Sequence, residues 1–467
     1  MRFEALEDWL QWQEGLHPSA MDLGLERVQR VSDAMAWPVR PFALIIVAGT
    51  NGKGSSVAYL DAMYSAAGYR TGTYTSPHLQ RYNERIRIGG EEASDAEIMA
   101  SFARLDAARG ETTITYFEYA TLAAMDLFHQ RGVDLAIMEV GIGGRLDAVN
   151  IFDADCALVT TVDIDHRKWL GDDRESIGHQ KAGIFRAHTP AVSAEYDPPQ
   201  SLVKYAQSLR TPLAILGWHY DLHEEPGDTW TFAGQYDSIA HLPRPGLPGQ
   251  WQLRNAAGAL AVLEQLRARL PVPFSAMAAG LLDPGLRGRF QQIHSAPDVF
   301  VDVAHNPQAA RSLASNLRTQ AHSGPTFAVV AMLGDKDLGA ALQPLIEEVD
   351  GWYVGTTTGS RGLPAASLAQ ALCEVGGNAP SVFGSATDAF RAAIEVDKNA
   401  RIVVFGSFHT VGDILALVES PDFVAQHLVV KNSQSSSDIG AGLVSLVTGV
   451  TASGVDGDTQ AHESQHG

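Results

Sequence analysis

The segment Phe42 to Ser56, FALIIVAGTNGKGSS, constrains the fold more than any other part of the chain. The run from Phe42 to Ala48 is apolar, which is typical of a strand buried on both faces. Gly49 to Ser55 then holds three glycines, and a helical pattern follows from Val57. A strand, a glycine-rich turn and a helix together direct backbone N–H groups at a phosphate chain. The segment therefore predicts a phosphate-binding loop, with Lys53 facing the outer phosphates.

The loop departs from the general phosphate-loop pattern G-x-x-x-x-G-K-[ST]. Val47 stands at the first glycine position, and Gly54 separates Lys53 from Ser55. Taken alone, the segment could also be a glycine-rich turn in an α/β domain that binds no phosphate. The spelling GTNGKGS resembles the phosphate loop of the Mur ligase superfamily, and its Gly-Ser ending resembles the folate branch of that superfamily.

Composition excludes some classes of protein. The chain has 467 residues, enough for two or three domains, and its 45% hydrophobic and 19% charged residues are typical of a globular protein with a sizeable core. A formal net charge of −20 argues against nucleic acid as a general partner, although local basic pockets can still bind small anions. Cys156 and Cys373 provide neither a disulfide framework nor a cysteine metal cluster.

The N-terminal segment MRFEALEDWLQWQEGLH carries acidic residues where a signal peptide would be basic and then apolar. The sequence has no uninterrupted apolar stretch long enough to cross a bilayer. Together with the low cysteine count, these features lead us to expect a cytoplasmic protein without a membrane partner. We also expect a monomer.

Apolar strand-like runs alternate with helical patterns over most of the chain, which favours α/β units around a mainly parallel sheet. Residues 135–140 and 156–162 are further candidates for buried strands, and residues 95–109 and 117–131 show helical patterns. Residues 218–250 are rich in Pro, Gly and aromatic residues. We expect this stretch to form irregular or β structure before a helix that opens near Asn255.

A domain boundary is predicted near residues 282–297, where Asp283, Pro284 and Gly285 end a helical pattern. Strand and helix patterns then restart, with expected strands at 299–304, 326–332, 351–356 and 401–406. These patterns indicate a second, smaller doubly wound domain. We predict domains at 1–285 and 297–420, followed at 424–467 by a tail without aromatic residues that we expect to be disordered.

Polar residues follow two of the expected strands. Glu139 closes the strand at 135–140, and a carboxylate in this place, near a phosphate loop, is suited to a Mg²⁺ ligand. Asp163, Asp165 and His166 follow the strand at 156–162. From these residues alone, Glu139 could equally be a surface residue at a strand end. A single histidine such as His166 is more often structural than catalytic.

Nine sequence blocks occur in order along residues 1 to 419: GTNGKGS, TSPHL, FEYATLAAM, EVGIGGRLDAVN, DIDH with WLGDDRESIG and KAGIFR, GRFQ, DVAHNP, GDKD and GSFHTVGD. In this order they resemble the bifunctional dihydrofolate synthase/folylpolyglutamate synthase family of bacteria, relatives of the Mur ligases. The resemblance implies an α/β fold with a Mur-ligase-like P-loop ATPase domain, built on a mainly parallel sheet, and a smaller Rossmann-like C-terminal domain.

The resemblance also implies a reaction. The family uses ATP to join the amine of L-glutamate to the carboxylate of dihydropteroate, giving dihydrofolate, or of reduced folates, giving polyglutamates. Because a carboxylate is anionic and has no good leaving group, transfer of the γ-phosphoryl group first makes an acyl phosphate, which the amine then attacks. Mg²⁺ and Lys53 would neutralise the gathered anions, and positioning would supply much of the remaining acceleration.

The matching motifs imply the residues of the nucleotide and metal sites. Contacts to ATP are implied for Gly49, Thr50, Asn51, Gly52, Lys53, Gly54, Ser55, Asn255, Arg289 and Asp302. Ser76, Glu139 and His166 correspond to ligands of Mg²⁺. Lys181 corresponds to a lysine that carries a carbamate, although without the resemblance it would be taken for an ordinary solvated lysine. His305 would contact the nucleotide base or phosphates, and it joins Lys53 and Lys181 as a candidate catalytic residue.

Three segments imply a pterin site. MDLGLERV at residues 21–28 resembles the loop that covers dihydropteroate in bifunctional members, and two later segments match other parts of that pocket. The residues implied are Asp22, Leu23, Gly24, Leu25, Thr115, Tyr116, Phe117, Glu118, Leu146, Asp147 and Ala148. Phe117 could stack on a flat heterocycle, although without its neighbours it would be taken for a core aromatic residue.

Two alternative functions remain open. A Mur-type ligase acting on a UDP-linked cell-wall precursor is disfavoured by the segments that match the pterin pocket, and by the absence of an obvious N-terminal UDP-binding domain. A nucleotide-binding paralogue without catalysis is suggested by Arg167 and Lys168, two cations beside His166 where the family usually has a polar and an acidic residue. The presence of Lys53, Glu139 and Lys181 counts against that paralogue.

Overall fold

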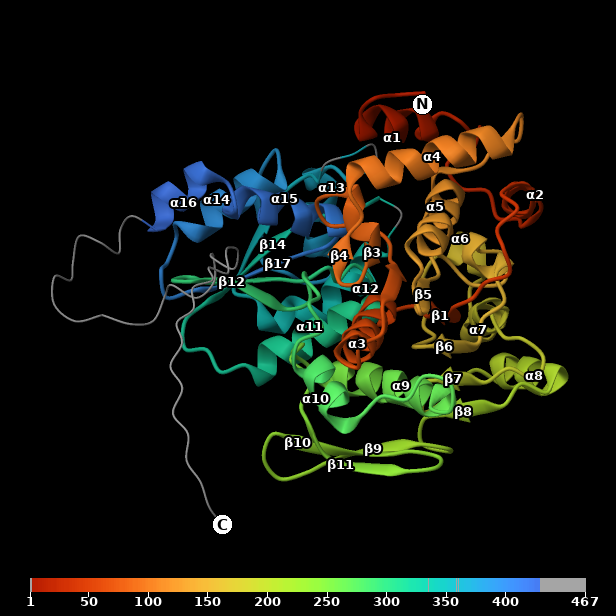
Figure 1. Ribbon diagram of the computed structural model, residues 1–467. Helices are drawn as coiled ribbons and strands as arrows, with labels where there is room; N and C mark the ends of the chain where they lie inside the picture. Colours follow the sequence, from red (N-terminus) through yellow and green to blue (C-terminus); the bar gives the residue numbers. More distant parts are fainter. Residues whose placement is uncertain (1, 335, 358, 360, 429–467) are drawn as a thin grey trace, which may run out of the picture. The chain divides into compact units, whose positions relative to one another are not determined.

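Two large sheets and one small sheet organise the chain in the computed structural model, which describes residues 2–334, 336–357, 359 and 361–428 (Figure 1). The two large sheets are called the first and the second sheet below. The first sheet has the strand order β4-β3-β2-β5-β1-β6-β7-β8. Its strands are β1 (Ala43–Ala48), β2 (Thr71–Tyr74), β3 (Ile86–Ile88), β4 (Glu91–Glu92), β5 (Leu135–Glu139), β6 (Cys156–Val159), β7 (Ala191–Ser193) and β8 (Leu213–Ile215). The strands from β2 to β8 in this order are parallel, and β3 and β4 add an antiparallel edge. The mainly parallel sheet predicted from the sequence is confirmed.

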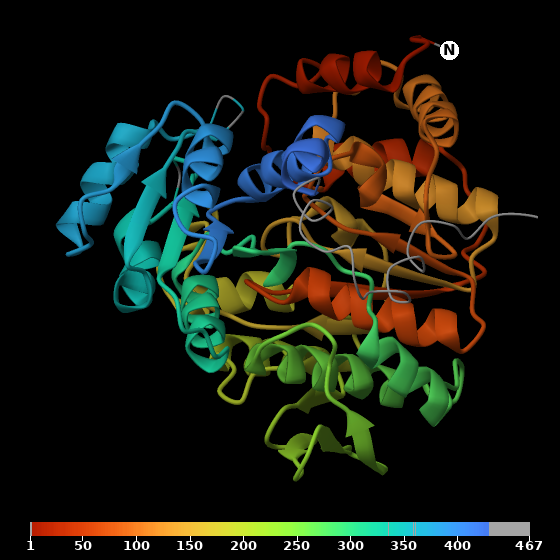
Figure 2. The ribbon, with the colours of Figure 1, turned by 90° about the vertical axis from the view of Figure 1, so that its left-hand side faces the viewer.

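Helices cover both faces of this sheet, which explains why every residue of β1 is buried. Leu44, Ile46 and Ala48 belong to one apolar core, and Ala43, Ile45 and Val47 belong to another. The first core includes residues of α1 (Leu6–Glu14), α2 (Glu26–Ala34), α4 (Asp95–Arg109), α5 (Tyr116–Arg131), α7 (Arg174–Ala182) and α8 (Gln200–Leu209). The second includes residues of α3 (Lys53–Ala66), α9 (Gln250–Leu266) and α10 (Phe274–Leu282), and Figure 2 shows α3 and α9 on the same side of the sheet.

Capping residues fix two of the helices near their predicted bounds. Ser94 caps α4 and Thr115 caps α5, and each forms a reciprocal capping box with a glutamate three residues later. Short helical turns complete this part of the chain: η1 (Tyr82–Arg85), η2 (Ala148–Ile151) and α6 (Arg167–Leu170). The strand predicted to reach residue 162 is shorter, because β6 ends at Val159.

A three-stranded antiparallel sheet packs against α9. It consists of β9 (Asp221–Glu224), β10 (Thr229–Ala233) and β11 (Ser238–Pro243) in the order β11-β10-β9, and it lies beside α9 in Figure 1. Trp230, Phe232 and Leu242 are buried in the same core as α9. The β structure expected for residues 218–250 is confirmed, whereas α9 opens at Gln250, five residues before the expected Asn255.

The second sheet follows a break after α10. Its strand order is β12-β13-β17-β14-β15-β16. The strands are β12 (Gln291–Ser295), β13 (Asp298–Val301), β14 (Thr326–Val330), β15 (Gly351–Val354), β16 (Ser381–Val382) and β17 (Arg401–Phe405). Its helices are α11 (Pro307–Thr319), α12 (Leu338–Leu342), η3 (Gln343–Glu348), α13 (Ala365–Glu374), α14 (Ala386–Ile394) and α15 (Phe408–Val418). All pairs are parallel except β12 with β13.

The chain divides into two compact units, Met1–Ala416 and Leu417–Gly467. Both sheets belong to the first unit, so the domain bounds 1–285 and 297–420 stay a prediction. The tail predicted from residue 424 begins inside α16 (Pro421–Leu428), and residues 429–467 lie outside the described residues. Among the residues that are described, no helix combines the length and the apolar character needed to cross a membrane.

Candidate active site

The glycine-rich loop joins β1 to α3 and is held from the side of β6. The Thr50 N–H donates to Thr161 O at 2.8 Å, and the Asn51 N–H donates to Thr161 Oγ1 at 3.0 Å. Gly52 has a φ of 85°, and a Cβ atom there would lie 2.3 Å from Asn255 Oδ1, so only glycine fits at this position. The backbone of the loop is therefore fixed between β1 and α3 by its hydrogen bonds to Thr161, which follows β6.

The helix after the loop begins at Lys53, four residues earlier than predicted. Its N-cap, Gly52, has no side chain to accept from the first-turn N–H groups, which leaves those groups available to an anion. Lys53 Nζ donates to the carbonyl oxygens of Gly49 and Thr50, at 3.1 and 3.3 Å. The lysine therefore reaches back over the loop, on the side where a phosphate chain would lie.

A cavity of about 200 Å³ opens over the loop and takes residues from both sheets. It brings together every residue implied for the nucleotide, metal and catalytic sites: Gly49, Thr50, Asn51, Gly52, Lys53, Gly54, Ser55, Ser76, Glu139, His166, Lys181, Asn255, Arg289, Asp302 and His305. Trp251, Gln252, Gln308 and Phe408 also line it and were missed by the sequence prediction. The convergence of residues more than 250 positions apart, Gly49 and His305 among them, makes this cavity the candidate active site.

The surroundings of two of the three implied metal ligands, Glu139 and His166, shift their pKa values. Glu139 ends β5 and is 5% exposed, and its Oε2 accepts from the Ser76 N–H at 3.3 Å. Burial raises the pKa of Glu139, while Lys53, the Ser76 N–H and Arg289 oppose that shift. Burial lowers the pKa of His166 to about 4, so its imidazole is uncharged near neutral pH and offers a lone pair.

The donor set fits a divalent cation that also binds phosphate oxygens. A hydroxyl, a carboxylate and an uncharged imidazole face the cavity, and a positive ion would offset the burial of Glu139. Within the described residues, no group of three His, Cys, Asp or Glu side chains is arranged to hold a metal ion. The side chains of the protein would therefore fill only part of the coordination of the ion and leave positions for the nucleotide or water, unlike a structural metal site.

The C-terminal sheet contributes a partly buried pair of opposite charges, Arg289 and Asp302. Asp302 accepts from the N–H groups of Phe290 and Ala304, both at 2.8 Å, and the Arg289 guanidinium lies 5.2 Å above the Phe408 ring. Burial raises the pKa of Asp302, and Arg289 opposes that shift. His305 is fixed by a 2.8 Å contact between its Nδ1 and Val303 O, and burial lowers its pKa to about 4.

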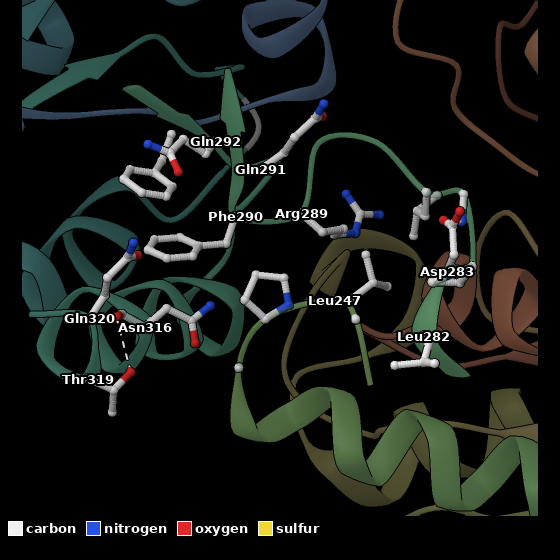
Figure 3. Close-up of a pocket in the computed structure, with 17 residues that line it drawn as sticks. Leu247, Leu282, Asp283, Arg289, Phe290, Gln291, Gln292, Asn316, Thr319 and Gln320 are labelled. Atoms are coloured by element: carbon white, nitrogen blue, oxygen red, sulfur yellow. Dashed lines mark hydrogen bonds between the residues drawn. The ribbon is translucent and has the colours of Figure 1, made fainter. Parts of the chain in front are cut away.

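A wider hollow adjoins this cavity and shares Pro248, Arg289 and Asn316 with it. Its volume is about 640 Å³, and in Figure 3 Leu247 and Leu282 lie on one side of it while Phe290 and Asn316 lie on the other. The Phe290 ring stacks on Phe300 at 4.7 Å between centroids. The hollow thus offers apolar and aromatic surface next to the charged cavity.

A second, more apolar cavity of about 130 Å³ lies next to the segment that follows β5. Of the residues implied for the pterin, it is lined by Asp22, Leu23, Gly24, Thr115, Phe117, Glu118, Leu146, Asp147 and Ala148, together with Ala20 and Met21. Gly141 and Ile142 line both cavities, so the two are neighbours. Leu25 and Tyr116 do not line it, because Leu25 packs into the first core and the Tyr116 ring packs on Tyr82 at 5.7 Å.

Asp147 is the buried acid of this second cavity. Its carboxylate accepts from the N–H groups of Ile142 and Val149, both at 3.0 Å. Burial raises its pKa to about 6, although those N–H groups oppose the shift. The Phe117 ring packs against Gly141, and a Cβ atom at Gly141 would lie 2.7 Å from Cζ of that ring. The cavity therefore combines a flat aromatic wall with an acid that titrates close to neutral pH.

Comparison with known proteins places these cavities in a family. Residues 47–263 match the Mur ligase middle domain, and residues 288–408 match the Mur ligase glutamate ligase domain. The dihydrofolate synthase/folylpolyglutamate synthase of Escherichia coli K12 is 42% identical over 419 residues, covering 89% of this chain and 96% of that protein. The chain belongs to the dihydrofolate synthase/folylpolyglutamate synthase family.

Solved structures of this family share the fold. E. coli FolC in complex with DHPP and ADP is 41% identical and has a TM-score of 0.84, covering 89% of this chain and 98% of that one. A bifunctional folylpolyglutamate synthase/dihydrofolate synthase with Mn, AMPPNP and L-glutamate bound is 42% identical with a TM-score of 0.82 over the same shares. The chain is thus an ATP-dependent ligase of the Mur type, as its motifs predicted.

Lys181 is not the solvated lysine that its sequence context suggests without the family. Its side chain lies in the first cavity and the residue is only 2% exposed. Burial holds its pKa well below the usual range, and the neighbouring Lys53 adds to that effect, while Asp165 and Asp147 oppose it. Burial therefore shifts this amine toward its uncharged form.

Arg167 and Lys168, which suggested a decayed paralogue, do not line the cavity. Both are exposed. Arg167 pairs with the exposed Asp172 at 2.7 Å, and Lys168 Nζ lies 5.5 Å from the Trp169 ring centroid. Because both charged groups are exposed to solvent and lie outside the cavity, they do not occupy the place of a cation near His166.

Proposed function

We propose that this enzyme uses ATP and Mg²⁺ to join L-glutamate to dihydropteroate, and also to reduced folates, through an acyl phosphate. The observation that carries the proposal is the shared wall of the two cavities at Gly141 and Ile142. A flat heterocycle in the second cavity would extend its carboxylate toward the first, where the residues of the phosphate loop lie.

The first chemical step is attack of the carboxylate oxygen on the γ-phosphorus, with ADP as the leaving group. Lys53 and the N-terminal N–H groups of α3 would bind the phosphate oxygens, and they face the cavity without rearrangement of the loop. In the second step the glutamate amine forms the amide bond and phosphate leaves. His305 would contact the phosphates or the base of the nucleotide.

The divalent cation would be held by Ser76, Glu139 and His166. When bound, Mg²⁺ would neutralise charge on the phosphoryl group that is transferred. We propose Mg²⁺ as the physiological ion because hydroxyl, carboxylate and phosphate oxygens suit a hard cation, although the imidazole is a less usual partner for it. Asn255, Arg289 and Asp302 would hold the nucleoside, with the hollow of Figure 3 next to them.

We propose that Lys181 carries a carbamate. Carbamate formation joins the uncharged amine to carbon dioxide and releases a proton, and the lowered pKa of Lys181 supplies that amine. The modification would replace a buried amine beside Lys53 by an anion that can engage the metal. We also propose that the enzyme acts as a monomer in the cytoplasm.

An acceptor comparison tests the function. Purified enzyme with ATP, Mg²⁺ and glutamate receives dihydropteroate, tetrahydrofolate or a UDP-muramoyl precursor, and ADP release is measured with and without glutamate. We expect glutamate-dependent ADP release with the first two acceptors and none with the third. Release only with the UDP-linked acceptor would instead establish a cell-wall ligase, and nucleotide binding without turnover would establish the decayed paralogue.

A further inference from the structure

Asp165 is one of the residues that connect the second sheet to the wall of the active-site cavity. Its Oδ1 accepts from Lys336 Nζ at 3.0 Å, and its Oδ2 accepts from Asn306 Nδ2 at 2.9 Å. Lys336 lies between β14 and α12, and Asn306 caps α11, so both partners come from the second sheet. Asp165 follows β6 of the first sheet.

The ion pair is buried from solvent. The side chains of Lys336 and Asp165 are 8% and 11% exposed. Asp165 lines the cavity, whereas Lys336 does not. The contact of Lys336 with the cavity wall therefore runs through the carboxylate that it binds, although its charge also lowers the pKa of His166 and of His305. A buried pair of this kind favours one arrangement of its partners.

Asp165 in turn controls the backbone of the next residue. Its Oδ1 also accepts from the His166 N–H at 2.8 Å. His166 has a φ of 52°, in the left-handed region that residues other than glycine rarely adopt. Such a conformation persists only where surrounding contacts determine it, and the Asp165 carboxylate provides that contact.

We propose that Lys336 is a positioning residue, which acts through Asp165 to hold the His166 imidazole in place as a metal ligand. This inference rests on the proposed role of His166. Partners that orient a metal-bound histidine commonly change metal affinity or activity by about tenfold to hundredfold when they are removed. The GDKD block, which had no assigned role in the sequence, gains one here.

A second ion pair between the same two sheets serves as a matched control. Arg311 of α11 binds Asp163 at 2.7 Å, two residues before Asp165. Its side chain is 53% exposed, and neither Arg311 nor Asp163 lines the cavity. Loss of this pair removes a similar contact between the sheets without reaching His166.

The test compares Lys336→Met with Arg311→Met, and measures AMPPNP affinity with and without Mn²⁺ by calorimetry. We expect Lys336→Met to reduce the gain in affinity caused by Mn²⁺ about tenfold or more, and to lower kcat with little change in KM for glutamate. Arg311→Met should match the wild type in both. Lys336→Arg should restore much of the metal-dependent affinity, and the thermal midpoint of each variant reports its folding.

The double variant Asp165→Ala/Lys336→Met completes the cycle. Because Lys336 acts through Asp165, the double variant should bind Mn²⁺ no more weakly than Asp165→Ala alone. If Lys336→Met fails to fold, Lys336→Gln replaces it. Wild-type metal-dependent affinity in a folded Lys336 variant, or equal losses in Lys336→Met and Arg311→Met, would overturn the inference. The binding assay does not require turnover, so it separates this inference from the ligase reaction itself.

Discussion

Asn51 and Asn306 exchange two hydrogen bonds across the two sheets. Asn51 Nδ2 donates to Asn306 Oδ1 at 3.1 Å, and Asn306 Nδ2 donates back to Asn51 Oδ1 at 3.0 Å. Asn51 lies in the phosphate loop and Asn306 caps α11 with its side-chain oxygen. The loop that we propose to bind the nucleotide is thus fixed in part by the C-terminal sheet.

Asn306→Ser should raise KM for ATP by up to about thirtyfold, since two hydrogen bonds of ~1 kcal/mol each are lost from the loop. It should also lower kcat, because Asn306 no longer donates to the Asp165 carboxylate. Serine keeps an acceptor for the α11 N-terminus, so the helix cap is preserved. Steady-state kinetics with varied ATP provide the measurement. Asn51→Ser should raise KM for ATP at least as much, because Asn51 also donates to Gln308 and is itself a proposed ATP contact. An unchanged KM for ATP in both variants would contradict the proposed link between the loop and α11.

Lys53→Ala should abolish turnover and leave the protein folded. Among the described residues, the hydrogen bonds of the ammonium go to loop carbonyl oxygens, so its loss should cost little stability. A phosphoryl group in transfer would lose a cation that stabilises its charge. ADP release and the thermal midpoint are measured together. Lys204→Ala, on the exposed face of α8, is the control and should match the wild type in both. Unchanged turnover in Lys53→Ala would refute its assigned role.

Asp147 should make pterin binding depend on pH. Because burial raises its pKa to about 6, the carboxylate is ionised above that pH and protonated below it. The ionised form is the better acceptor for N–H groups of a pterin, so KM for dihydropteroate should rise as the pH falls through about 6. In Asp147→Asn that inflection should disappear. KM for ATP, measured over the same pH range, serves as the internal comparison. If the inflection in KM for dihydropteroate persists in Asp147→Asn, a group other than Asp147 causes it.

Removal of residues 429–467 should leave kcat within about twofold of the full chain, because the described site is built from residues 20–408. The dihydropteroate assay on the shortened protein provides the measurement. A large loss of activity at an unchanged thermal midpoint would show that this segment belongs to the working enzyme.

Local sequence patterns were sufficient for most of the fold. The buried strands β1, β5, β14 and β17 are short apolar runs, and α4 and α5 begin at strong capping boxes, so their positions were predictable. β12 and β16 were missed because the first is largely polar and the second consists of two exposed residues. Neither shows an apolar run or a clear alternation.

The residues of the site could be predicted where they belong to sequence motifs. Features of the site that depend on contacts between the sheets could not be predicted from the sequence. The resemblance supplied the residues that line the first cavity, but the burial of Lys181 and the outward direction of Arg167 and Lys168 required the fold. The ion pair of Asp165 with Lys336 joins residues 171 positions apart, and no local pattern indicates such a pairing.

The central claim is that the carboxylate of dihydropteroate is activated by phosphoryl transfer before glutamate attacks. Dihydropteroate labelled with a heavy oxygen isotope in its carboxylate is incubated with enzyme, ATP, Mg²⁺ and glutamate, and inorganic phosphate and dihydrofolate are analysed by mass spectrometry. An acyl phosphate predicts transfer of one labelled oxygen into phosphate for each dihydrofolate formed. Dihydrofolate formed with unlabelled phosphate, or no glutamate-dependent product at all, would contradict the account.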